Sequence, residues 1–242
     1  SQLDRQEALF TLGERILNNM EVTHATIIHC AEHNYCYRIS SDLFPLITYR
    51  AANITLNDVP QFNDIVQEIE DIKQTIKDSK VRISCHPSEF NVLASTNTDA
   101  VDRTITELNF YANFLDMIGC SADYNCPMNI HINNRQGSND EVVDRFIQNF
   151  NRLDSNCRNR IVIENDDKLN CWSVKQLITD FYPKSKIPIT FDYLHHKCHP
   201  DGWTEHQAIR FCCLTWGHIK PLFHYSESAP GNNPRKHADY AE

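Results

Sequence analysis

The sequence predicts an α/β protein with a parallel sheet, namely a (β/α)8 TIM barrel that lacks its first and last strands. Three observations support this prediction. Short apolar runs alternate with amphipathic helical segments six times. Five of these runs end on a histidine or a carboxylate, and no glycine-rich phosphate turn follows any of them. Six strands cannot close an eight-stranded barrel, so we expect residues 1–242 to form one catalytic domain, truncated at both ends.

Composition limits the classes of function. The chain has 41% hydrophobic residues, and no run approaches the roughly 18 apolar residues of a membrane-crossing helix, so we expect no membrane association. Ten cysteines without a Cys-x-x-Cys pair indicate reduced thiols and an intracellular location, either the cytoplasm of a prokaryote or a nucleus. The net charge of −9 argues against binding nucleic acid by broad charge neutralisation. Any contact with DNA would therefore need a local basic or metal-filled groove.

The N-terminal segment is predicted to be helical before the first strand begins. Apolar residues at helical spacing predict helices over 3–20 and 23–32. His29 and His33 lie one turn apart and could chelate a metal ion, but we interpret them as a solvated helix end. Residues 35–39 then form the first predicted strand.

The rest of the chain repeats a helix and a strand in strict alternation. Gly119 is expected to terminate the second of these helices as a C-terminal cap. Strict alternation is typical of a parallel sheet with crossover helices. The predicted helices cover 61–78, 99–118, 139–153, 172–181 and 203–216, and the predicted strands cover 81–85, 128–132, 160–164, 187–192 and 219–223.

Potential metal ligands occur where the strands end. The carboxyl ends of parallel strands meet on one face of a barrel, so we expect these side chains to converge there. Histidine nitrogen combined with carboxylate oxygen suits zinc, manganese or iron(II). Seven ligands are too many for one ion and predict two or three, with Glu164 as a bridging carboxylate. Centres of this kind mostly hydrolyse phosphate esters. The candidates are His86, His131, Glu164, Asp192, His195, His224 and His237.

Seven motifs resemble the ultraviolet damage endonuclease family, which is related to endonuclease IV and to the xylose-isomerase-like TIM barrels. They occur in the family's order between about residue 35 and residue 240. They are Tyr37-Arg-Ile-Ser-Ser-Asp-Leu-Phe-Pro45, Cys85-His-Pro-Ser-Glu-Phe90, His131-Ile-Asn133, Ile163-Glu-Asn-Asp166, Phe191-Asp-Tyr-Leu-His195, Phe223-His-Tyr-Ser226 and Arg235-Lys-His237.

This resemblance implies a specific activity. The family incises damaged double-stranded DNA immediately 5′ to an ultraviolet-induced lesion, using a cluster of divalent ions that is typically manganese, with zinc as the alternative. It uses no nucleotide cofactor. By the resemblance, all seven candidates above are metal ligands, and Glu164 and Asp192 are catalytic. Glu89 and Phe90 take the positions that probe the lesion, where the family usually has a glutamine in place of Glu89.

Two other functions are compatible with the sequence. One is a metal-dependent sugar isomerase, because that group also builds barrels from histidine and carboxylate ligands. The other is a truncated, non-catalytic homologue that binds metal or DNA without cutting. If both barrel-closing strands are absent, two exposed sheet edges would make the isolated chain prone to association and weak as a nuclease.

Overall fold

Five short parallel strands form the centre of the protein. The computed structural model describes residues 4–231 and 233–238. The strands follow one another across the sheet in chain order, without the reversal that a doubly wound sheet requires. This order is typical of a barrel, and in the described part of the chain the barrel is incomplete. The strands are β1 (Tyr37–Ile39), β2 (Ile83–Cys85), β3 (Met128–Ile130), β4 (Ile161–Glu164) and β5 (Ile189–Thr190).

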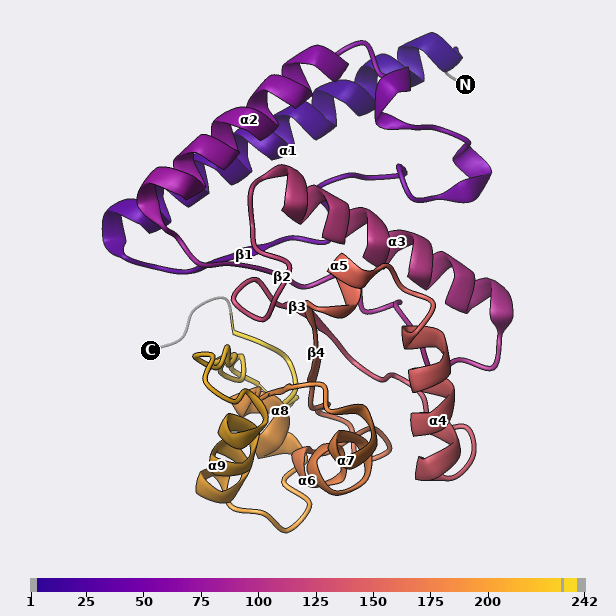
Figure 1. Ribbon diagram of the computed structural model, residues 1–242, viewed down its shortest axis with the longest axis vertical. Coiled ribbons are helices and arrows are strands. Elements are labelled where there is room, and N and C mark those ends of the chain that lie inside the picture. The colour runs from indigo at the N-terminus through magenta and orange to yellow at the C-terminus, as the bar shows by residue number, and fades with distance from the viewer. Residues whose placement is uncertain (1–3, 232, 239–242) are drawn as a thin grey trace.

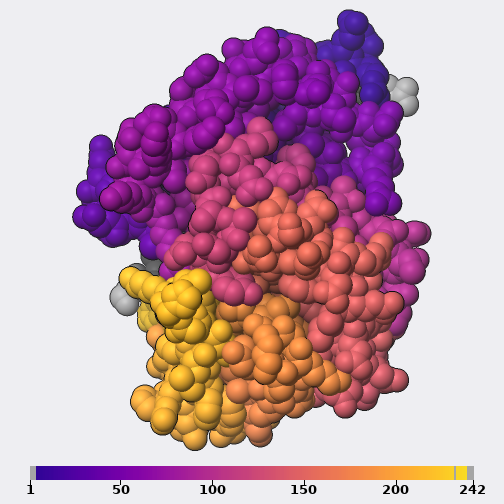
Figure 2. Space-filling model, in the orientation of Figure 1, coloured from indigo at the N-terminus to yellow at the C-terminus, as the bar shows by residue number. Residues whose placement is uncertain are grey.

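Helices connect the strands and cover the sheet. Figure 1 shows α1 and α2 lying side by side, and Figure 2 shows successive segments stacked in chain order from the N-terminal helices to the C-terminal residues. Among the described residues, no helix combines the length and the apolarity needed to cross a membrane. The helices are α1 (Arg5–His33), α2 (Phe62–Ser79), α3 (Thr98–Met117), α4 (Asn139–Phe150), α5 (Ser155–Arg158), α6 (Val174–Gln176), α7 (Tyr182–Ser185), α8 (Tyr193–Cys198) and α9 (Glu205–Thr215), with short turns η1 (Arg50–Ala52), η2 (Leu56–Asp58) and η3 (Leu177–Phe181).

The first helix differs from the sequence prediction. The expected helices over 3–20 and 23–32 are one continuous helix, α1, within the described residues. The segment between them contains neither glycine nor proline, and the buried positions continue at helical spacing through Met20, Thr23 and Ile27. The prediction of two separate helices is therefore wrong, because no residue between them ends the first helix.

The predicted sixth strand, 219–223, is reduced to a single bridge. His224 pairs in parallel with Asp192, donating its N–H to the Phe191 carbonyl at 2.9 Å. Pro221 has no N–H to donate to a ladder, which prevents a longer strand at this point. The bridge still places His224 at the carboxyl end of β5.

Two helix ends show how local sequence sets the element boundaries. Gly119, at φ +78°, ends α3 as predicted, with hydrogen bonds from Gly119 N to Asp116 O at 3.0 Å and from Cys120 N to Leu115 O at 2.9 Å. The helix predicted over 172–181 instead runs on through η3 into α7, which contains Pro183. Pro183 lies in the first turn of α7, where a residue without an N–H is tolerated.

Arg160 is a fully buried cation next to the core. Its guanidinium donates to the Ser121 carbonyl at 3.1 Å and to the Cys120 carbonyl at 2.8 Å, and pairs with Asp116 at 2.6 Å. It thereby ties β4 to the end of α3 and to the loop that leads into β3. Such a charge is tolerated only because its donors are satisfied.

We expect Arg160→Ala to lower the free energy of unfolding by about 3–5 kcal/mol, because several buried carbonyls lose their donor and a cavity remains. Arg152→Ala is the matched control. It removes a half-exposed pair with Asp102 and should cost less than about 1 kcal/mol. Denaturant unfolding of both variants measures this difference. Equal losses would show that the Arg160 network adds nothing to stability.

Candidate metal centre

The carboxylate of Glu164 is the centre of the site. This residue ends β4 and is 2% exposed. Four histidines from separate parts of the chain surround it. Its Oε2 lies 3.4 Å from His86 Nε2, 4.0 Å from His131 Nε2 and 2.9 Å from His224 Nδ1, and its Oε1 lies 3.5 Å from His195 Nδ1.

The ends of neighbouring strands bring these side chains together. His86 and His131 come directly after β2 and β3, and the parallel pairing sets both next to the end of β4. Asp192 follows β5 and caps α8, where its Oδ1 accepts the His195 N–H at 2.8 Å. This cap fixes His195 in the first turn of the helix, on the side that faces Glu164.

The charges in this cluster are strongly coupled. Burial opposes ionisation of Glu164, but His224, His86 and His131 hold its pKa well below the usual range. Burial also opposes charge on His131, yet its contacts with Asp166 and Glu164 raise its pKa to about 9. For Asp192, burial is the largest effect and raises the pKa. A buried, ionised carboxylate of this kind needs a cation beside it, either imidazolium or a metal ion.

The donors form two groups suited to divalent ions. His86, His131 and Glu164 can bring one ligand atom each within 4.8 Å of one another, and so can Glu164, Asp192 and His195. Glu164 belongs to both groups, which is the position of a bridging carboxylate. Mixed imidazole and carboxylate donors suit zinc, manganese or iron(II). The residues present therefore fit the binding of divalent ions.

Two other candidate ligands, His224 and His237, lie next to these groups without belonging to them. His224 contacts Glu164 through Nδ1, while its Nε2 is buried without a hydrogen-bond partner among the described residues. The ring centroid of His237 lies 5.6 Å from that of His195, and His237 lines the cleft without joining either group.

Three polar residues that orient the ligands were not assigned from the sequence. Asp166 Oδ1 lies 3.2 Å from His131 Nδ1. Asn129 donates to Glu164 Oε2 from the neighbouring strand. Asn165 accepts the Asp192 N–H at 2.9 Å, and its carbonyl oxygen lies 2.8 Å from His195 Nδ1. Asn165 and Asp166 lie within the motif Ile163-Glu-Asn-Asp166, which could have indicated a role for them beside Glu164.

The site opens into a cleft of about 580 Å³. One wall follows β2 and includes Pro87, Ser88 and Glu89, and another follows β4 and includes Asp167 and Lys168. The cleft therefore lies at the carboxyl ends of the strands, with the Glu164 cluster at its base.

The two residues expected to probe a lesion lie in the loop after β2. Glu89 lines the cleft and is exposed, and its carbonyl accepts the Asn133 amide at 2.8 Å. The side chain of Phe90 is 81% exposed. Phe90 therefore does not pack in the core. An exposed ring could contact DNA, and the role of Phe90 in probing a lesion stays a prediction.

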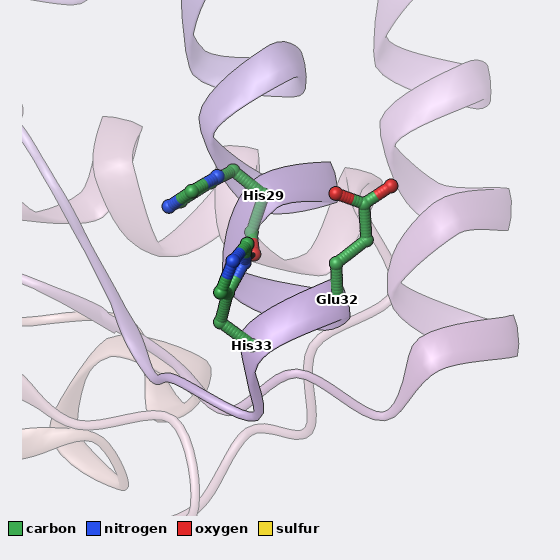
Figure 3. Close-up of side chains that lie close together, drawn as sticks. All are labelled: His29, Glu32 and His33. Carbon is green, nitrogen blue, oxygen red and sulfur yellow. Dashed lines mark hydrogen bonds between the residues drawn. The ribbon is translucent and has the colours of Figure 1, made fainter.

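A third group of potential ligands does not line this cleft. His29, Glu32 and His33 occupy one turn at the end of α1, before β1, and all three are exposed (Figure 3). His33 Nδ1 lies 2.8 Å from the His29 carbonyl, and the two ring centroids lie 4.1 Å apart. This geometry agrees with the interpretation of a solvated helix end.

Comparisons with known proteins place the chain in a family. The family described as UV-endonuclease UvdE matches residues 1–242. Proteins named UV DNA damage endonuclease are similar over the whole chain, with 28% identity in Bacillus anthracis (strain A0248) and 27% in Bacillus cereus (strain G9842), and the chain covers 73% of each.

Solved structures share the fold. The crystal structure of SacUVDE is similar with a TM-score of 0.80 and 31% identity, over 95% of this chain and 76% of that one. Endonuclease IV from Thermus thermophilus is similar with a TM-score of 0.59 and 12% identity, over 89% and 76%. D-psicose 3-epimerase from Clostridium cellulolyticum is similar with a TM-score of 0.58 and 12% identity, over 87% of this chain and 70% of that one. At 12% identity, these last two show the fold alone.

The strand order and these neighbours define a protein of the TIM-barrel class, with a histidine–carboxylate cluster at the carboxyl ends of its strands. Within that class, the chain belongs to the UV-endonuclease UvdE family.

We expect Phe90→Ala to change the free energy of unfolding by less than about 0.5 kcal/mol, because the ring is mostly solvated. Phe146→Ala, at a fully buried ring of α4, should cost about 3–5 kcal/mol. Thermal or denaturant unfolding measures both. A loss of several kcal/mol for Phe90→Ala would show that the ring packs against the protein in solution.

Proposed function

We propose that this chain is a DNA repair endonuclease that cuts the backbone 5′ to ultraviolet-induced lesions, with the aid of a cluster of divalent ions. Membership of the UV-endonuclease family supports a DNA repair endonuclease. The observation that carries the finer proposal is the carboxylate of Glu164, which two groups of metal-type donors share at the base of an open cleft.

In this proposal His86, His131, Glu164, Asp192 and His195 hold the ions, with His224 and His237 as further ligands. When bound there, divalent ions would supply the positive charge that phosphodiester hydrolysis needs at the scissile phosphate and at the attacking water. Asp166 and Asn129 orient His131 and Glu164, as outer residues do in metal sites generally.

The distribution of charge supports contact with DNA. Arg38 and Lys168 line the main cleft. Lys197 and Arg235 line an adjoining groove of about 540 Å³, which shares Asp167 with the cleft. Part of the negative surplus lies elsewhere, for example on α2, which lines neither space. The adjoining groove thus has more cations than carboxylates, whereas the main cleft is lined by five carboxylates, Glu89, Glu164, Asp166, Asp167 and Asp192, and would attract phosphates only when it holds divalent ions.

Incision of an end-labelled, ultraviolet-irradiated duplex tests this function. We expect cleavage 5′ to the lesion with manganese, none with a chelator, and little on the same duplex without irradiation. Denaturing electrophoresis against a sequence ladder locates the cut. Tight binding of the damaged duplex without incision, with either manganese or zinc added, would instead identify a non-catalytic homologue.

Glu164→Gln tests the shared carboxylate. We expect the purified protein to retain at least two divalent ions per chain, and the variant to lose them with at least about 100-fold of the activity, because one side chain serves both groups. Elemental analysis and the incision assay measure these losses. Glu70→Gln, at an exposed pair with Lys73, is the control and should keep ions and activity. A Glu164→Gln protein with full metal content would contradict the bridging role.

A further inference from the structure

The loop after β4 carries a large apolar side chain that neither the fold nor the metal centre uses. Leu169 is 75% exposed, although it lies between buried Asp166 and buried Trp172. We propose that Leu169 is a second apolar wedge beside Phe90, which enters damaged duplex DNA from the groove that adjoins the cleft. This inference rests on the proposed function and adds a residue that recognises the substrate.

The loop holds its tip in a fixed position. Cys171 donates its N–H to the Lys168 carbonyl at 2.8 Å, which closes a turn with Leu169 at its second position. Below the turn, Asp166 N donates to Trp172 O at 2.9 Å, and Trp172 N donates to Asp166 Oδ2 at 3.2 Å. Trp172 is fully buried, so the base of the loop is anchored in the core. A short loop with a rigid base and an apolar tip can enter a neighbouring molecule at little entropic cost.

The charges around Leu169 favour DNA as the occupant. Its neighbour Lys168 lines the cleft, while Leu169 itself lines the adjoining groove together with Lys197 and Arg235. An apolar side chain with cations nearby is complementary to a duplex, because the phosphates could contact the cations while the apolar side chain contacts the stacked bases. Leucine is among the side chains that proteins insert between base steps.

The sheet sets the two apolar side chains in loops that follow strands separated by one other strand. Phe90 follows β2 and Leu169 follows β4, and β3 lies between these strands. The residues that begin each loop line the same cleft. A duplex that covers both the cleft and the adjoining groove would therefore meet the loop of Phe90 and the loop of Leu169. A lesion that weakens stacking lowers the cost of both insertions, so two wedges sharpen the preference for damaged DNA.

The experiment measures binding separately from cutting. Leu169→Ala and the control Leu214→Ala are compared by fluorescence anisotropy with irradiated and unirradiated forms of one duplex, in calcium to prevent turnover. Leu214 is 67% exposed on α9 and lines neither the cleft nor the groove. We expect Leu169→Ala to bind the irradiated duplex about 10-fold more weakly, roughly the value of one lost stack, with unirradiated binding unchanged. Leu214→Ala should match the wild type.

Two further variants define what the side chain does. Leu169→Met should restore affinity for the damaged duplex, because methionine also wedges between bases. Phe90→Ala combined with Leu169→Ala should lose less than the sum of the single losses if both enter one distorted site. Melting temperatures of all variants should agree within the error of the measurement, because both side chains are exposed.

The outcomes separate this inference from the proposed function. If the wild type incises damaged duplex and Leu169→Ala binds it as Leu214→Ala does, the wedge is refuted while the endonuclease stands. If the wild type binds damaged duplex without cutting it and Leu169→Ala loses binding, the wedge stands while the nuclease activity fails. If Leu169→Ala instead abolishes self-association in sedimentation and leaves DNA binding intact, Leu169 contacts a second copy and the inference is overturned.

Discussion

The buried charge of Glu164 is the constraint that organises this protein. A carboxylate that is 2% exposed can stay ionised only if cations or donors surround it, and no single element of the chain supplies enough of them. They come from the residues that follow the ends of β2 and β3, from the first turn of α8 and from the bridge at His224, with Asn129 contributing from within β3. A parallel arrangement in chain order delivers every one of these ends to the same face.

Asp166 links that centre to the wall of the cleft. One of its oxygens contacts His131, and the other accepts the N–H of Trp172 at the base of the following loop. The position of the loop and the orientation of a candidate metal ligand therefore depend on one side chain. A ligand that displaced the loop would also disturb His131. Conversely, an ion that fixed His131 would also restrain Asp166, and with it the base of the loop that carries Leu169.

The sequence allowed the strand ends to be predicted because the signal there is local. An apolar run that stops at His86 or at Glu164 marks both the strand and the residue that follows it. The outer partners Asn129 and Asp166 could not be assigned, because their role depends on which strands pair and in which register. Residues 219–223 differ, because there a local signal was outweighed: the apolar pattern suggests a strand, but Pro221 has no N–H for a ladder and a single bridge forms at His224.

An acidic chain can bind DNA only if some of its cations lie close to the DNA phosphates. Lys168 lines the cleft, and Lys197 and Arg235 line its adjoining groove, while the carboxylates of the cleft, such as Glu164, would need bound divalent ions to tolerate phosphates nearby. Weak overall attraction has a consequence for selectivity. With little charge neutralisation to hold an intact duplex, affinity must come from contacts that only a distorted duplex offers, and the exposed side chains of Phe90 and Leu169 are suited to such contacts.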